Sequence, residues 1–219
     1  MAAVSLRFLW RICATALLLG SAGCGAEARA ERDENACYAA LKDAGVAFEH
    51  VPHARALGVE WPIKLLGPID GVRVYGSKND APTSYLDCRL GLALIEWAPL
   101  LAREGVVGVQ HYSMYRHDAR VGKSTKTSGH ALGRAIDVAY FDLEDGRRLS
   151  VLEDWKNRER GAPPCEVDSK NRSEALMRKL VCEATERKVF RMVLTPHYNA
   201  AHKNHLHLEI GEGDHAWVG

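Results

Sequence analysis

Four of the ten histidines in this sequence crowd into one short stretch near its end. They are His197, His202, His205 and His207. If residues 204–210 form a β-strand, side chains alternate between its faces, so His205, His207 and Glu209 share one face. Neutral imidazoles side by side are poor core material, because each ring nitrogen needs a partner, but they suit a transition-metal ion. The stretch therefore predicts a metal site, the alternative being a solvated edge strand with incidental histidines.

Two further residues of ligand type, His130 and Asp137, lie well upstream. His130 sits in a turn between Gly129 and Gly133, and Asp137 begins the strand that follows. Because glycines let the turn fold back, the imidazole and the carboxylate can converge with His207 on one point. Zinc takes such nitrogen and oxygen ligands, and a catalytic zinc site keeps one position open for water. The spacing predicts one zinc ion in a site of two histidines and one carboxylate.

Asp137 must stand on a strand if its carboxylate is to meet the late histidines. Residues 135–141 have the alternating pattern of such a strand. Alternation divides them between two faces, with Ile136, Val138 and Tyr140 on one and Ala135, Asp137 and Ala139 on the other. The alanines leave room beside the carboxylate.

The rest of the pattern predicts helices and short strands. Helices are expected over residues 36–44, 86–103 and 173–188, where apolar residues recur at helical spacing. Strands are expected over residues 106–116, 149–152, 189–194 and 204–210, with brief strands and turns in 46–82 and loops in 117–128 and 153–168. We therefore expect an α+β fold in which a small, mainly antiparallel sheet carries the metal site and is flanked by helices, as one domain over residues 31–219.

The first thirty residues have the layout of a secretory signal. Arg7 and Arg11 give a positive start, residues 12–19 an apolar run, and residues 20–23 a small-residue exit. The apolar run is too short to span a bilayer. Two processing routes stay open, namely cleavage after Ala28-Arg29-Ala30 and lipidation at Cys24. We expect an exported protein of the periplasm or cell envelope, either soluble or lipid-anchored.

Four cysteines remain outside this segment, namely Cys37, Cys88, Cys165 and Cys182. An even number in an exported chain indicates two disulfides, for which three connectivities exist. We expect Cys37 to pair with Cys88, tying two helices together, and Cys165 with Cys182, tying a loop to a helix. The alternative is that some are buried free thiols. The absence of a C-x-x-C pair argues against a thiolate zinc site.

Composition bounds the partners. The 219 residues are 47% hydrophobic, which suits one globular domain with a substantial core. Twenty-nine lysines and arginines against 28 acidic residues leave a net charge of +1. Since no basic block stands out, we expect no nucleic-acid partner.

The same residues carry a resemblance to a known family. Ser128, His130 and Asp137, followed by the histidines of residues 202–207, resemble the S-x-H-x6-D and H-x-H pattern of zinc peptidases of the lysostaphin, D-Ala-D-Ala carboxypeptidase and murein endopeptidase type. Within that group the chain is similar to the bacterial extensin-like C-terminal domain family over about residues 37–210. Its further motifs D-G-R, S-V-x-x-x-W and V-L-x-P-x-Y-N-x-A-H are met at residues 145–147, 150–155 and 193–202.

The resemblance implies roles for individual residues. The zinc ligands would be His130, Asp137 and His207. His205 would face a water as a base or as a stabiliser of the oxyanion, with His202 beside it in support. Zinc in such a site lowers the pKa of a water toward about 7.

Three further side chains have two interpretations each. Arg116, in an S-x-Y-R element, would either lie over the substrate carbonyl or carboxylate or form a structural salt bridge. Ser128 would either bind substrate or cap the turn before His130. Glu209 would either orient a histidine or be plain surface.

The sequence departs from the family pattern at two places. Many members carry cysteines where this chain has Leu57, before Gly58, and Tyr115, before Arg116. Since both are missing together, we infer one lost disulfide.

Taken together, these features predict an exported zinc metallopeptidase-like hydrolase that cleaves an amide bond in peptidoglycan peptides. The alternative is a non-catalytic wall-binding or scaffold module that retains the fold. A third possibility is a disulfide-stabilised structural domain without a metal. The expected partner is peptidoglycan or its peptides, and a membrane is expected only through an anchor at Cys24.

Overall fold

The computed structural model describes residues 21–77, 82–166, 169–211 and 216–219. The chain divides into two units, Met1–Ala36 and Cys37–Gly219. Helix α1 (Ser21–Asp43) begins in the first unit and ends in the second, so the helix expected over residues 36–44 starts much earlier than predicted. The first twenty residues of the expected signal segment lie outside the described residues. Within the described part, no helix combines the length and apolar character needed to cross a bilayer.

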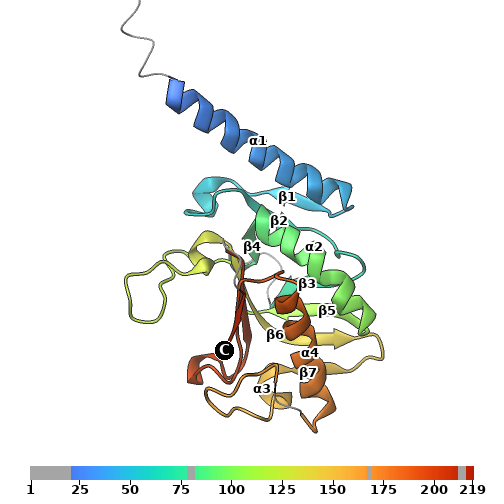
Figure 1. Cartoon of the computed structure of the whole chain (residues 1–219). Coiled ribbons are helices and arrows are strands. Elements are labelled where there is room, and N and C mark those ends of the chain that lie inside the picture. Colours follow the sequence, from blue (N-terminus) through green and yellow to red (C-terminus); the bar gives the residue numbers. More distant parts are fainter. Residues whose placement is uncertain (1–20, 78–81, 167–168, 212–215) are drawn as a thin grey trace, which may run out of the picture. The chain divides into compact units, whose positions relative to one another are not determined.

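A seven-stranded mixed sheet forms the centre of the second unit (Figure 1). Its strands are β3 (Arg73–Gly76), β5 (Val106–His111), β6 (Ala135–Leu143), β7 (Arg148–Ser150), β8 (Met192–Leu194), β9 (Leu206–Glu209) and β10 (Trp217–Val218). They lie in the order β10-β8-β9-β6-β5-β3, with β7 paired to β6. The β3–β5 and β8–β10 pairs are parallel and the others antiparallel. The predicted α+β fold with a mainly antiparallel sheet is confirmed.

A smaller antiparallel sheet precedes it. It consists of β1 (Phe48–His50), β2 (Pro62–Leu65) and β4 (Tyr85–Asp87), with short 3-10 turns η1 (His53–Arg55) and η2 (Pro82–Ser84) between them. Strand β4 leads directly into helix α2 (Cys88–Arg103), because Asp87 caps that helix by accepting a hydrogen bond from the Arg89 backbone N–H at 3.0 Å. The Asp87 backbone N–H also donates to the Gly133 carbonyl at 2.9 Å. This hydrogen bond connects the small sheet to Gly133, three residues after His130.

Helices α2 and α4 (Arg172–Glu186) pack together against one face of the large sheet (Figure 1). Trp97 of α2 is fully buried between them, where its indole N–H donates to the Leu180 carbonyl at 3.3 Å. Its ring meets Phe141 and Phe190 edge to face, with centroids 6.1 and 5.3 Å apart. Such aromatic contacts stabilise a core beyond the area they bury. The helices predicted over residues 86–103 and 173–188 are confirmed to within two residues at each end.

Strand β6 contains a bulge that reverses its faces. Opposite β5, His111 pairs with Val138 and Gln110 with Tyr140, so the residue between them, Ala139, has no partner. Beyond that point Phe141 enters the core and Tyr140 is half-buried on the opposite side, under the guanidinium of Arg148 at 5.3 Å. The prediction that Tyr140 shares a face with Val138 is therefore wrong.

The strand expected over residues 149–152 is shorter than predicted. Strand β7 ends at Ser150, whose hydroxyl accepts from the Glu153 N–H at 3.1 Å. The Asp154 carboxylate accepts in return from the Ser150 N–H at 2.7 Å. This reciprocal capping begins helix α3 (Val151–Asp154), so Val151 and Leu152 are helical.

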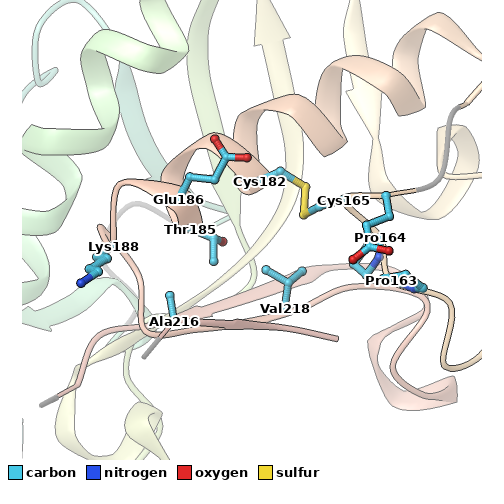
Figure 2. Close-up of a pocket in the computed structure, with 10 residues that line it drawn as sticks. Pro163, Pro164, Cys165, Cys182, Thr185, Glu186, Lys188, Ala216 and Val218 are labelled. Carbon is cyan, nitrogen blue, oxygen red and sulfur yellow. A yellow bond between two sulfur atoms is a disulfide. The ribbon is translucent and has the colours of Figure 1, made fainter. Parts of the chain in front are cut away.

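Both expected disulfides are present. Cys37–Cys88 joins α1 to the start of α2 and is buried, with 4% and 0% of each residue exposed. Cys165–Cys182 joins the loop after α3 to α4 and lines an open cavity of about 460 Å³ (Figure 2). The free-thiol alternative is excluded for these four residues.

We predict that the two disulfides stabilise the domain unequally. Removing Cys37–Cys88, which spans 51 residues, is expected to cost about 4 kcal/mol of unfolding free energy, against about 3 kcal/mol for Cys165–Cys182, which spans 17. Buried Cys37 and Cys88 also leave a cavity when truncated. Urea unfolding of the two paired Cys→Ala variants measures the difference, and an equal or reversed order would contradict the prediction.

A buried charged cluster ties the loop after α3 to α4. Arg178 donates to Glu174 from Nε and Nη2 at 3.0 and 2.6 Å, and to the Pro164 carbonyl from Nη1 at 2.6 Å. Glu174 also accepts from the Lys156 and Asn157 backbone N–H groups, at 3.1 and 3.2 Å.

His197 completes this cluster. It is fully buried, accepts from Arg178 Nη2 at 2.8 Å and donates from Nδ1 to the Glu159 carbonyl at 2.7 Å. Burial lowers its pKa, which keeps the ring neutral as these two bonds require. His197 is therefore a structural residue that fixes the loop leading to the later histidines, and it is not incidental.

We predict that this cluster contributes acid-sensitive stability. Burial raises the pKa of Glu174, but hydrogen bonds from Arg178 and the backbone outweigh it, and the net pKa is lowered. The stabilisation is therefore present above the unfolded pKa of about 4.3 and lost as the pH falls through the lower folded value. Arg178→Met leaves the buried Glu174 carboxylate without its cationic partner. This substitution is expected to lower the free energy of unfolding by about 3 to 5 kcal/mol at neutral pH.

Urea titrations at neutral pH and near pH 3, which is well below the unfolded pKa, measure both effects. Glu174→Gln is the matched control, because it keeps the shape and removes the titrating group. It should flatten the acid side of the stability profile, and an unchanged profile would refute the assignment to Glu174.

Candidate metal centre

Three buried side chains from separate elements converge on one point. His130 comes from the 3-10 turn η3 (Gly129–Leu132), Asp137 from β6 and His207 from β9. His130 Nε2 lies 2.9 Å from Asp137 Oδ1 and 3.0 Å from His207 Nδ1, and the last two atoms are 3.0 Å apart. The structure thus brings together the three residues predicted as ligands.

Sheet register and a capped turn produce this convergence. Asp137 stands directly opposite His207 in the β6–β9 pair, which places the two side chains side by side on one face. Ser128 caps the turn before His130 by accepting from its N–H at 3.3 Å. Gly133 closes the turn with φ of 63°, and a Cβ there would lie 2.7 Å from the Asp87 nitrogen. A side chain at Gly133 is excluded both by this contact and by the backbone conformation.

The second nitrogen of each ring fixes where its proton lies. His130 Nδ1 is 3.1 Å from the Met114 carbonyl, which accepts only, so Nδ1 carries the hydrogen and Nε2 presents a lone pair. His207 Nε2 is 3.1 Å from the Glu209 carboxylate, so Nδ1 presents its lone pair. With both rings neutral, two lone pairs and a carboxylate oxygen face one another at about 3 Å. Such a set of acceptors needs a positive charge at its centre, which is either a proton bound between His207 and Asp137 or a divalent metal ion that takes nitrogen and oxygen ligands.

The electrostatics of the group agree with this requirement. Burial lowers the pKa of His207, but hydrogen bonds to Asp137 and Glu209 outweigh burial and raise that pKa to about 9. Burial likewise raises the pKa of Asp137, yet the hydrogen bonds with both histidines hold it well below its usual range. The group therefore attracts positive charge, which a proton supplies when no ion is bound.

The two carboxylate oxygens of Asp137 have different partners. Oδ1 faces the two histidines, whereas Oδ2 accepts from Arg116 Nη1 at 3.0 Å and from the Ser113 hydroxyl at 3.3 Å. Arg116 thus forms the salt bridge that was one of its two expected roles, with 49% of its side chain exposed. Oδ1 is therefore available to a metal ion, while the hydrogen bonds to Oδ2 hold the carboxylate in place.

His205 and His202 lie beside the three ligand-type residues. His205 Nε2 is 3.6 Å from Asp137 Oδ1, and its Nδ1 bonds to the Asn204 side chain at 3.0 Å, so Nε2 presents a lone pair toward the site. The His202 ring lies 5.0 Å from the His205 ring. Burial and the neighbouring histidines lower the pKa of His202 to about 4. His202 is therefore uncharged at neutral pH.

The remaining predicted residues have structural roles. Ser128 is buried and caps the turn, while its role toward a substrate stays a prediction. Tyr115 donates its hydroxyl proton to the Leu57 carbonyl at 3.1 Å. Leu57 and Tyr115 stand where many family members carry cysteines. These two positions are in contact here, and a hydrogen bond joins them in place of a disulfide.

Three other groups at the site were not predicted from the sequence. The Met114 carbonyl is a backbone group without a signature, and Ser113 was only part of a longer motif. His111 is 1% exposed, neither of its ring nitrogens has a hydrogen-bond partner within the described residues, and burial lowers its pKa to about 4. It lies at the end of β5, within the segment 106–116 that was predicted as a strand, but its burial was not predicted.

The cavity at the Cys165–Cys182 disulfide is separate from this centre. It is lined by Pro163, Pro164, Lys188, Val218 and neighbours, none of which belongs to the histidine cluster (Figure 2).

Fold and site together describe an α+β domain with a candidate metal centre of two histidines and one aspartate. The chain belongs to the family of the extensin-like protein C-terminus, whose model matches residues 35–217. Comparison with curated proteins and with solved structures finds no match.

We predict that Glu209 positions His207 for metal binding. Gly129 supports this, because a Cβ there would lie 2.4 Å from Glu209 Cδ, so the carboxylate fills the space that a side chain would take. Glu209→Gln removes the charge that holds the proton on Nε2, and Gly129→Ala displaces the intact carboxylate. Each is expected to weaken zinc binding by about 10- to 100-fold.

Competition with a chromophoric chelator at neutral pH measures the affinity. Glu153→Gln, the same change at an exposed site, should leave it unaltered. Wild-type affinity in both Glu209→Gln and Gly129→Ala would make Glu209 a surface residue.

Proposed function

We propose that this protein is an exported zinc metallopeptidase-like hydrolase that cleaves an amide bond in peptidoglycan peptides. The observation that carries the proposal is the convergence of His130 Nε2, Asp137 Oδ1 and His207 Nδ1 within about 3 Å of one another, with His205 Nε2 beside them. The same residues give the resemblance to the zinc peptidases of the lysostaphin, D-Ala-D-Ala carboxypeptidase and murein endopeptidase type.

Zinc suits the donor set better than other common ions. Two imidazole nitrogens and one carboxylate oxygen are its usual catalytic ligands, whereas calcium and magnesium prefer oxygen alone. Held there, zinc would supply Lewis acidity that polarises a carbonyl and lowers the pKa of a water. His130, Asp137 and His207 would hold the ion.

The neighbouring residues would handle the proton and the developing charge. Burial lowers the pKa of His205, so its Nε2 is available to accept a proton and later return it. Arg116 is half-exposed and keeps donors beyond the one bound to Asp137, so it can hold a carbonyl oxygen or a carboxylate. His202, being uncharged, would keep His205 in place without competing for its proton.

The cellular setting is inferred from the covalent structure. Two disulfides form and persist in oxidising compartments such as the bacterial periplasm, which agrees with the signal-like residues 1–30. Lipid anchoring at Cys24 remains the alternative to release as a soluble protein.

A wall-binding module without turnover is the second candidate. The salt bridge between Arg116 and Asp137 favours it, because it gives one donor of the guanidinium a structural role that needs no substrate. The two candidates share the metal and differ in catalysis.

We predict that wild-type protein binds one zinc ion and releases fragments from purified peptidoglycan. His205→Ala should keep the zinc and lose about 10² to 10⁴ in rate, because only proton transfer is removed. His207→Ala should lose the zinc itself. His117→Ala, an exposed histidine outside the centre, is the matched control and should behave as wild type.

Metal analysis and chromatography of the released fragments test these outcomes. Stoichiometric zinc without any released fragment would favour the wall-binding module. No zinc bound at micromolar metal would rule out the hydrolase and any wall-binding module that depends on the metal.

A further inference from the structure

A row of five aromatic and imidazole rings crosses the surface beside the metal centre. Neighbouring ring centroids lie 5.6, 5.5, 5.0 and 6.1 Å apart. In order, the rings belong to Trp217, Tyr198, His202, His205 and Tyr112. We call this set the aromatic row. Residues 112, 198–205 and 217 supply it, so the fold brings three separate segments of the chain together.

The outer members of the aromatic row are unusually exposed. Trp217, Tyr198 and Tyr112 are 48%, 45% and 40% exposed. Every other Trp, Tyr and Phe in the described part of the chain is buried or half-buried. Exposed aromatic surface gains free energy when a ligand covers it, so the contact of these exposed rings with one connected set of rings indicates a binding surface.

The orientation of the rings limits the shape of the ligand. Successive planes are turned by 85, 64, 47 and 77°. The row therefore offers separate faces and no continuous plane for a large flat molecule. A chain of small rings, each packing its apolar face on one aromatic ring, matches this geometry.

The polar groups of the row limit its chemistry. Asn204 donates from Nδ2 to the Tyr112 hydroxyl at 3.4 Å, and the Asn199 side chain accepts from His202 Nδ1 at 2.8 Å. Lys203 is the one charged side chain in the described stretch from 198 to 205. Phenol, indole, amide and neutral imidazole groups suit the hydroxyls of an uncharged ligand. An acidic peptide would instead be matched by cationic side chains.

We propose that the aromatic row is a saccharide-binding subsite for a chain of neutral pyranose rings, such as N-acetylhexosamines. Saccharide binding by the aromatic row is a function separate from amide hydrolysis, since it requires neither a metal nor turnover. Because His202 and His205 lie in its middle, a bound sugar chain would pass directly by the metal centre. A peptide attached to that chain would then be presented to the centre.

Titration with an N-acetylglucosamine oligomer, on protein freed of metal by a chelator, tests the subsite. We expect saturable binding accompanied by a change in tryptophan fluorescence, because Trp217 is the one exposed tryptophan within the described residues. Tyr198→Ala and Trp217→Ala should each lower affinity about tenfold. Trp217→Phe, which keeps a ring, should retain most of the affinity and lose the fluorescence change.

Leu66→Ala is the matched control, since Leu66 is 58% exposed and lies outside the row. Circular dichroism confirms that each variant is folded. No oligomer binding by wild type at millimolar concentration would overturn the proposal, as would affinity unchanged by both Tyr198→Ala and Trp217→Ala. Binding of a sugar-free wall peptide that depends on the same rings would make the row a peptide site. Because the assay needs no zinc, its outcome is distinct from that of the hydrolase test.

Discussion

The pairing of Asp137 with His207 across β6 and β9 is the constraint on which the candidate centre depends. A slip of one residue would turn His207 into the core and Leu208 toward the site. The register is held from behind, where Ile136, Leu206 and Leu208 are fully buried in the core that α2 and α4 cover. The hydrophobic pattern of two short strands thereby fixes the position of polar ligands on their other face.

The same pairing would be costly without a cation. Buried acceptors that face one another lose their water and gain no hydrogen bond in return. The surrounding groups do not relieve this: Met114 and Glu209 hold the ring protons on the outer nitrogens, and Arg116 and Ser113 engage only Asp137 Oδ2. Each of these contacts orients a lone pair inward. The local structure therefore favours a positive charge among the three facing atoms, supplied by a proton or by a metal ion.

The extent to which sequence reveals this structure differs between residues. Side-chain alternation in residues 204–210 and the glycine turn around His130 predict the site, because each is a local signal. The even cysteine count predicts two disulfides but leaves three connectivities possible. The bulge at Ala139 was not predictable, since alternation continues through it and only the pairing with β5 reveals it. The structural role of His197 was not predictable for a related reason: its partners Arg178 and Glu159 are distant in sequence, and a histidine carries no sign of burial by itself.

His205 belongs both to the candidate centre and to the aromatic row. Its Nε2 faces Asp137, while its ring lies against Tyr112 on one side and His202 on the other. The ring cannot turn toward the centre or away from it without changing those two contacts, and Asn204 holds its other nitrogen. A ligand that covers the neighbouring rings would restrict His205 further, because burial removes the space into which it could rotate. Occupation of the row would thus orient the residue to which we assign proton transfer, which couples binding of one part of a substrate to chemistry on another.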